Sequence, residues 1–431
     1  MSTKKAITQW AKDLLATTRS DGWRNTITEL GTSRDKQSWH EVGFEVFRSE
    51  QELEDLYNSD PFAQRIVREP VDAAFRQGWD LAPPADMDPE KAKAEERLIL
   101  DLLWDHQAVS DLKEALYWGR RDGKGGLLLG VDDGALTMIE PLEIERIREI
   151  RFLTPLMSLE MNPRLWDTDT RSDGFGEPLT YTVQIFSGTA APSIEVHRSR
   201  IILTGGIPTS RKTKIANNWR DLSVLQATYR KLRDFDSSVA GIANALTDNS
   251  QAVLKIRDFV KMLATEPPAT FTNRMRIMEL ARSLKIMPVD ADKEDFDFVE
   301  RTFAGVADVT RILMSALAGA TTMPLTVLFG SSPAGLNATG ESDIRLWYDQ
   351  VQSEQRDEYT RPMEQLIYMA AVVAGATTPE AWGIRWRSLW QMTSTEKADH
   401  EKKIAETDQI NIPVAEQCII GIQGAHEGLK C

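Results

Sequence analysis

Residues 222–246 read LSVLQATYRKLRDFDSSVAGIANAL, and this stretch is the strongest structural signal in the chain. Its large apolar residues recur every three or four positions: Leu222, Leu225, Tyr229, Leu232, Phe235, Val239, Ile242 and Leu246. That spacing places them on one face of an α-helix. A helix of this length spans roughly 38 Å at 1.5 Å per residue, about twice the average for globular proteins. The stretch therefore predicts one unusually long helix.

Two further long helices are expected downstream. Residues 296–320 keep the helical spacing, and residues 341–373 predict a third long helix that ends near Gly375. A small module separates the first two long helices. We expect strands at 252–256 and 285–289 in this module, with helices at 259–263 and 273–284 between them.

The first half of the chain mixes helices with strands. Ser49, with Glu52 three residues later, has the pattern of a capping box, and Pro61 suits the first turn of the next helix. Further helices are expected at 89–103 and 111–120, after a short helix near the N-terminus at 4–15. Short strands are expected at 126–131, 136–139, 180–186 and 194–203. The fold class is therefore α+β and mainly helical.

Bulk composition restricts the class of protein. The chain has 431 residues, of which 42% are hydrophobic and 27% charged, as in soluble proteins with a core. Its length predicts two or three domains. We find no apolar run long enough for a membrane span and no secretory signal. The two cysteines, Cys418 and Cys431, cannot build a disulfide framework, which indicates synthesis in a reducing cytosol.

The charge distribution is uneven. The net charge is −14, which argues against a tight, sequence-reading DNA binder. Basic residues nevertheless gather before and within the first long helix and in the small module. These patches predict contact with a DNA backbone or an acidic partner, or pairing with an acidic neighbouring subunit. The candidate contact residues are Arg211, Lys212, Lys214, Arg230, Lys231, Arg257, Lys261, Arg274 and Arg276.

Catalytic motifs are missing from the sequence. We find neither a phosphate-binding glycine loop nor a nucleophile elbow. His197-Arg198-Ser199 is a lone His-x-Ser tripeptide. A two-histidine phosphodiesterase needs two such motifs, because the two histidines act as general acid and general base. The acidic run at 290–297 is expected to be a solvated loop before a helix, with a magnesium site as the alternative. We therefore expect no enzyme activity, no cofactor and no metal.

Several strings resemble the portal proteins of tailed bacteriophages, over about residues 50–415. They are LYNSDP at 56–61 with RIVREPVDAA at 65–74, EVHRSR at 195–200, MPLTVLFG at 323–330 and SPAGLNATGESD at 332–343. The last string is the most specific. The order of helical, mixed and long-helical regions is similar as well.

The resemblance implies a function and a set of partners. Portal proteins form a ring, usually of twelve subunits, at one capsid vertex of the virion. Double-stranded DNA passes through the ring during packaging and ejection. The implied partners are terminase, the head–tail adaptor and the major capsid or scaffold protein, with no membrane contact. The subunit is made in the host cytoplasm.

The resemblance also implies a division of the chain. Residues 1–48 would form an N-terminal arm and 49–221 a wing with the mixed β region. The stem helices would be residues 222–247 and 296–320, and the strand–helix–strand clip between them would be residues 248–295. The tunnel loop and the long helix would occupy 321–373. A C-terminal wing and short crown would follow at 374–431. The implied tunnel-loop residues are Gly330, Ser331, Ser332, Gly335, Leu336, Asn337, Thr339 and Gly340.

Two other functions stay open. Related sequences carry the label of an anti-defence phosphodiesterase that cleaves cyclic nucleotides, and His197 with Ser199 would form its site. The chain could also be a virion adaptor that encloses no channel. Ring stoichiometry separates this last reading from a portal.

Overall fold

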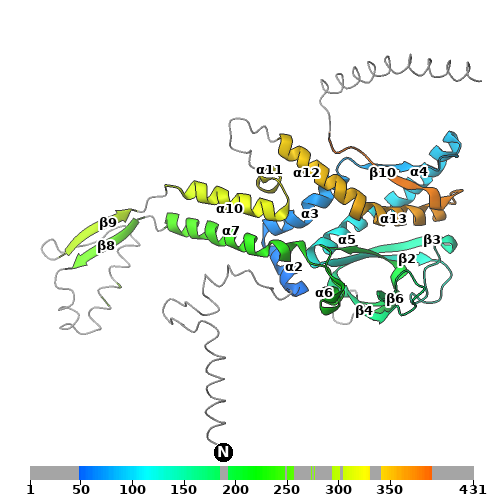
Figure 1. Ribbon diagram of the computed structural model, residues 1–431, viewed down its shortest axis with the longest axis horizontal. Coiled ribbons are helices and arrows are strands. Elements are labelled where there is room, and N and C mark those ends of the chain that lie inside the picture. The colour runs from blue at the N-terminus through cyan, green and yellow to red at the C-terminus, as the bar shows by residue number, and fades with distance from the viewer. Residues whose placement is uncertain are drawn as a thin grey trace, which may run out of the picture. The chain divides into compact units, whose positions relative to one another are not determined.

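The computed structural model describes residues 48–184, 193–247, 250–256, 294–300, 304–330 and 341–390, and the single positions 273 and 276. The helices that it describes are α2 (Glu50–Ser59), α3 (Pro61–Phe75), α4 (Pro89–Asp105), α5 (Ala108–Asp122), α6 (Arg211–Ala216), α7 (Val224–Thr247), α10 (Val306–Thr321), α11 (Leu325–Phe329), α12 (Glu341–Glu354) and α13 (Thr360–Val373). The strands are β1 (Trp79–Ala82), β2 (Lys124–Asp132), β3 (Glu149–Leu156), β4 (Met161–Trp166), β5 (Pro178–Gln184), β6 (Ser193–His197), β7 (Ile201–Gly205), β8 (Ser250–Ile256), β9 (Glu294–Glu300) and β10 (Gly383–Trp386). This confirms the α+β, mainly helical class (Figure 1).

The first two helices begin where their caps predict. The Ser49 hydroxyl accepts from the Glu52 N–H at 3.2 Å, and the Glu52 carboxylate accepts from the Ser49 N–H at 3.0 Å. Asp60 caps α3 by accepting from the Phe62 N–H at 2.8 Å, with Pro61 as the first helical residue. These bonds satisfy N–H groups that a helix leaves without an internal partner.

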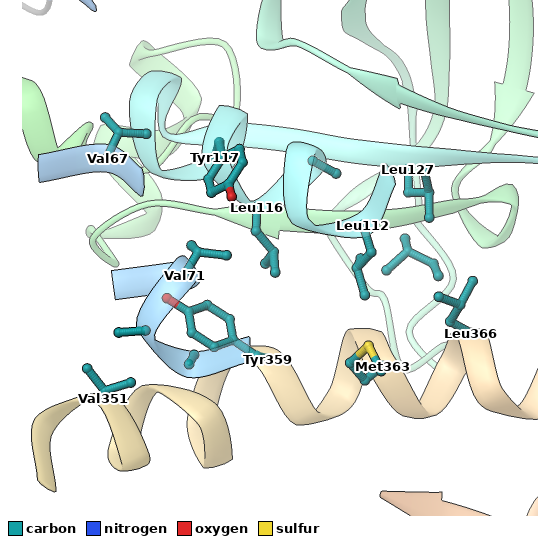
Figure 2. Close-up of a cluster of buried hydrophobic side chains, with 14 of the residues drawn as sticks. Val67, Val71, Leu112, Leu116, Tyr117, Leu127, Val351, Tyr359, Met363 and Leu366 are labelled. Carbon is teal, nitrogen blue, oxygen red and sulfur yellow. The ribbon is translucent and has the colours of Figure 1, made fainter. Parts of the chain in front are cut away.

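One hydrophobic core joins segments that are far apart in the sequence (Figure 2). Its central side chains come from α3, α5, β2, α13 and the turn before α13: Val67, Val71, Leu112, Leu116, Leu127, Tyr359, Met363 and Leu366. Burying each large aliphatic side chain contributes about 1.5–3 kcal/mol. The core therefore fixes the third long helix against the first half of the chain.

β2 is central to the first sheet and separates two cores. It pairs antiparallel with β3 on one edge and with β7 on the other. Leu127 and Leu129 pack in the main core, while Leu128 joins a second core that includes Met161 and Tyr181 from the sheet β4-β5-β6. This follows from strand geometry, because successive side chains point to opposite faces.

The strand expected at 136–139 is not formed, and that prediction is wrong. β2 pairs with β3, and the residues between them form a loop. The Asp133 carboxylate accepts from the Ala135 N–H at 3.2 Å, and Glu140 accepts from the N–H groups of Leu136 and Thr137, each at 3.2 Å. Because side chains take these donors, the segment cannot extend a hairpin ladder. Leu136 is 95% exposed.

The single strand expected at 194–203 is two strands in different sheets. β6 ends at His197, residues Arg198–Arg200 make one 3-10 turn, and β7 begins at Ile201. β6 pairs with β5, whereas β7 pairs with β2. Arg200 is buried and holds the turn, because its guanidinium donates to the Asp133 carboxylate at 2.6 Å. Periodicity alone cannot reveal such a switch between sheets.

The first long helix is confirmed as α7, but the second begins later than predicted. Residues 294–300 form β9, which pairs antiparallel with β8, and α10 starts only at Val306. Phe296 and Phe298 alternate with Asp295 and Asp297, which is the period of a strand. Gly305, with φ of 86°, marks the true start of the helix. Residues 294–297 are therefore not the solvated loop that we expected.

The third long helix is confirmed, with one irregularity. α12 and α13 are joined by a π-helical turn at Gln355–Tyr359, so helical structure runs from Glu341 to Val373. Gly375 has φ of 70° and follows the helix end. None of the described helices is both long and apolar enough to cross a membrane.

Several expectations lie outside the described residues. They are the N-terminal helix at 4–15, the module elements at 259–263 and 285–289, nearly all of 273–284, and the tail from 391 with both cysteines.

Candidate functional site

The α7–α10 helix pair is the first part of the candidate site. The two helices lie side by side (Figure 1), and α7 buries Leu225, Leu232 and Phe235 toward the rest of the chain. On α10, Val309 is 56% exposed and Ile312 is 67% exposed. These two residues are one turn apart, so they form an apolar row on the outer face.

An aromatic cluster anchors the base of the pair. Phe62, Phe235 and Phe329 come from α3, α7 and α11, with ring centroids 5.1–5.4 Å apart. The Arg65 guanidinium also donates to the Leu328 carbonyl at 3.2 Å. These contacts fix α11 and hence the position at which the predicted tunnel loop leaves the body.

The predicted tunnel-loop residues are mostly beyond what the structure describes. Gly330 ends α11 with φ of 68°, and α12 begins at Glu341. Ser331, Ser332, Gly335, Leu336, Asn337, Thr339 and Gly340 lie outside the described residues. The left-handed conformation of Gly330 suits glycine because it has no Cβ.

The π-helical turn holds a charged cluster that the sequence did not reveal. Arg120 donates to the Glu354 carboxylate at 3.3 Å and to the Val67 carbonyl at 3.1 Å, and the Tyr359 hydroxyl donates to Glu354 at 2.9 Å. Arg120, Glu354 and Glu358 line a cavity of about 250 Å³ beside the base of the helix pair. Desolvation and the neighbouring Glu354 charge raise the pKa of Glu358.

This cluster is positioned to connect the helix pair with the body. The same cavity is lined by Thr228 of α7 and Thr321 of α10. π-helical turns often occur at functional positions. No sequence signal could have found the cluster, because Arg120 and Glu354 meet only in the folded chain.

Two of the basic residues predicted for DNA or partner contact have partners within the subunit. Arg211 is exposed but donates to the Gly176 carbonyl at 2.7 Å, and Lys214 pairs with Asp221 at 3.0 Å. Gly176 permits this contact, because a Cβ there would collide with the guanidinium.

Other members of the basic set are more accessible. Lys212, Lys231 and Arg276 are exposed, and Arg230 is half-buried. Arg257, Lys261 and Arg274 lie outside the described residues. Within the described ranges, the accessible members of this set therefore lie on α6, on α7 and at position 276.

His197 and Ser199 form a loop clasp. The His197 Nδ1 and the Ser199 hydroxyl are 2.8 Å apart, and this hydroxyl accepts from the Leu142 N–H at 2.7 Å. The His197 N–H donates to the Met138 carbonyl at 2.8 Å. Burial, with the charges of Arg198 and Arg200, lowers the pKa of His197. The pair thus fastens the 133–143 loop to the end of β6.

The described residues offer no metal centre. Within the described ranges, no three His, Cys, Asp or Glu side chains gather closely enough to hold an ion.

Known proteins resemble the chain over most of its length. Two relatives are named anti-CBASS protein Acb1: one from Caulobacter sp. (strain RHG1) is 27% identical over 90% of this chain, and one from Sphingomonas paeninsulae is 24% identical over 90%. This chain covers only 62% of the length of either relative. An uncharacterized protein of Haemophilus influenzae is 25% identical over 86% of this chain and 81% of its own length.

Two solved structures are also similar. The neck of an empty GTA particle, computed with C6 symmetry, is 16% identical, with a TM-score of 0.49 over 79% of this chain and 84% of that chain. The neck of a native GTA particle, computed with C12 symmetry, is 15% identical, with a TM-score of 0.48 over 83% and 89%.

The family match is the most extensive finding. Residues 51–410 match the family described as phage portal protein. The match begins within α2 and includes α7, α10 and the long helix from Glu341 to Val373. The chain belongs to the phage portal protein family.

Proposed function

We propose that this chain is the subunit of a portal ring, typically of twelve copies, at one capsid vertex of a virion. Double-stranded DNA would enter through the ring during packaging and leave through it during ejection. The observation that carries this proposal is the family match over residues 51–410. The net charge of −14 supports it, because an acidic channel repels phosphates and lets DNA slide without sticking.

The helix pair is the proposed stem of the ring. Closing a ring requires two different surfaces that meet head to tail between neighbouring copies. The exposed row of Val309 and Ile312 on α10 supplies one apolar surface of this kind. With β9 assigned to the module, the stem corresponds to α7 and α10.

The remaining roles follow the division implied by the resemblance, with one boundary moved. The clip, expected at 248–295, would extend to residue 305 because β9 precedes α10, and it would dock terminase and later the head–tail adaptor. Residues 330–340 would project into the channel as the tunnel loop. Exposed Lys212, Lys231 and Arg276 would guide DNA or contact an acidic partner. In this proposal the subunit acts without catalysis.

Native mass spectrometry tests the ring directly. We expect a mass near twelve times 48.5 kDa and a central hole in negative-stain images. Ile312→Asp should abolish the ring, because a charge would then be buried between neighbours. Leu136→Asp is the matched control, since Leu136 is exposed in a loop, and it should leave the ring intact. A wild-type monomer would overturn the proposal, and a compact assembly without a hole would favour the virion adaptor.

Deletion of residues 331–339 tests the tunnel loop separately. Because the loop connects two helices that are anchored independently, the ring should still assemble. DNA packaging or retention should fall. Failure of this variant to assemble would assign the loop a structural role.

A nucleotide-acting phosphodiesterase is the second candidate, favoured by the two relatives named anti-CBASS protein. This chain covers 62% of each, and its His197 makes a loop clasp. Cleavage of a cyclic dinucleotide by the purified protein, lost in His197→Ala, would favour the enzyme. Absence of cleavage would favour the portal.

A further inference from the structure

A wide groove lies where α4 ends, α5 begins and β1 passes nearby. It has a volume of about 840 Å³, and its walls include Trp79, Leu100, Leu103, Trp104, Asp101 and Asp105. We call it the α4 groove. Neither the α7–α10 helix pair nor the charged cluster at the π-helical turn contributes to its wall. It is therefore separate from the parts assigned to the proposed portal function.

The apolar residues of the α4 groove are unusually accessible. Trp104 is 84% exposed and Leu100, one helical turn earlier, is 39% exposed. Leu103, by contrast, is buried and fixes this turn of α4 to the main core. An indole ring is a large apolar surface and is normally found at least partly buried. Held on a rigid helix beside a cavity, Trp104 has the features of an interface anchor.

The negative charge in the wall of the α4 groove favours a basic partner. The two charged residues of its wall, Asp101 and Asp105, are both carboxylates, and both are exposed. Asp101 is 3.9 Å from Arg97, with both side chains largely in solvent, so that pairing is weak. A cationic group can therefore approach the carboxylates and also lie over the Trp104 ring, where the π-face attracts it.

We propose that the α4 groove docks a basic amphipathic segment of another protein. One large apolar side chain of the partner packs against Trp79, Leu100 and Trp104. A neighbouring lysine or arginine lies beside Asp101 and Asp105. DNA and anionic lipid do not fit this surface, because the carboxylates repel phosphate groups. The groove is lined by residues of a single subunit, so the isolated chain can be tested for docking.

Fluorescence anisotropy with a defined probe tests the docking. The probe is a labelled helical peptide of leucine and lysine, and the control peptide has glutamate in place of lysine. We expect the full-length protein to bind the basic peptide and not the acidic one. Trp104→Ala should weaken binding by about tenfold or more, whereas the matched control Leu136→Ala should not change it. The double variant Asp101→Asn with Asp105→Asn should weaken binding and flatten its dependence on salt.

Two outcomes of this titration would overturn the proposal. Equal loss of binding in Trp104→Ala and Leu136→Ala would show nonspecific adsorption. Equal affinity for the two peptides would remove the role of the carboxylates. Co-sedimentation with phosphatidylglycerol vesicles that depends on Trp104 would assign the surface to a membrane instead.

Oxidative footprinting identifies other occupants. Trp104 should be oxidised readily in the free full-length protein and protected when the basic peptide is added. Protection in the isolated chain without peptide would show that the chain covers its own groove. Protection that appears only in an assembled ring would assign the groove to a second copy. Either result would replace the proposed partner.

Discussion

The body core and the α7–α10 helix pair use similar helices in different ways. On α5, Leu112 and Leu116 pack against α3, β2 and α13 and are buried. On α10, Val309 and Ile312 have the same kind of helical spacing but remain exposed. Apolar spacing therefore predicts a helix but not what covers its apolar face. The body buries its apolar face within one chain, whereas the pair leaves part of its apolar face in solvent.

The largest expected effect is the breaking of a buried ion pair in the body. Arg121 donates to Asp122 at 2.7 and 2.9 Å, with both side chains almost fully buried. Asp122→Ala should lower the free energy of unfolding by about 3–5 kcal/mol, because it leaves the Arg121 charge buried and uncompensated. Urea denaturation measures the loss.

The helix pair offers a matched control for this prediction. Asp308 is 3.5 Å from Arg311 on α10, with both side chains exposed. Asp308→Ala should therefore cost about 0–1 kcal/mol. Similar losses for the two variants would show that the body and the pair do not differ in this way.

The next effect compares two aliphatic truncations. Leu112→Ala should destabilise the body by about 2–5 kcal/mol, because it leaves a cavity. Ile312→Ala should change the stability of the separate subunit by no more than about 0.5 kcal/mol, because the side chain is already in water. Thermal unfolding of both variants measures the difference. A large loss for Ile312→Ala without any assembly would place this residue inside the fold.

The buried side chain of Lys124 makes the stability of the body depend on pH. This lysine is buried, with its Nζ donating to the Met161 carbonyl at 2.8 Å, and burial lowers its pKa to about 8. Between about pH 8 and the ordinary lysine pKa of about 10.4, the unfolded chain binds the proton that the folded chain has released. The Lys124 contribution to stability therefore rises with pH across this window, by up to about 3 kcal/mol.

Lys124→Met is the test, with denaturant titrations at several pH values. The variant should lack the increase that the wild type shows above about pH 8. Two buried tyrosines, Tyr117 and Tyr181, have raised pKa values and oppose the trend at the alkaline end. An identical pH profile for variant and wild type would contradict the assignment to Lys124.

The smallest expected loss of stability comes from the helix cap at the start of α2. Ser49 and Glu52 exchange two capping bonds at the beginning of α2. Ser49→Ala should cost about 1 kcal/mol, and Ser49→Asp should restore most of it, because aspartate also caps helices well. Thermal unfolding measures both. No loss for the alanine variant would show that α2 is held by packing alone.

Local signals predicted a large part of the fold. The caps at Ser49 and Asp60, the spacing within α7 and the end near Gly375 depend on residues within a few positions of one another. One error involves a distant segment: β9 was assigned to a helix, and its strand partner β8 lies some forty positions earlier. The other error is local: Leu136 was assigned to a strand, but its N–H donates to the Glu140 side chain four residues away.

The candidate site was less predictable than the fold. The sequence singled out the basic residues, but it could not show that Lys214 is used by Asp221 within the subunit. It also singled out His197 with Ser199, whose clasp role depends on the Leu142 N–H. Trp104 was not singled out, because a tryptophan at helical spacing from Leu100 has the same pattern whether it is buried or exposed.

The α+β class, most helices, the acidic charge and the resemblance that the family match confirms could all be derived from the amino-acid sequence. These depend on spacing, composition and short motifs. Three features became visible only in the folded chain: Arg121 and Asp122 are buried, Arg120 meets Glu354, and Trp104 lies exposed beside a mainly apolar groove whose wall includes two aspartates. Burial depends on contacts between segments that are distant in the chain, and periodicity does not encode which surface remains uncovered.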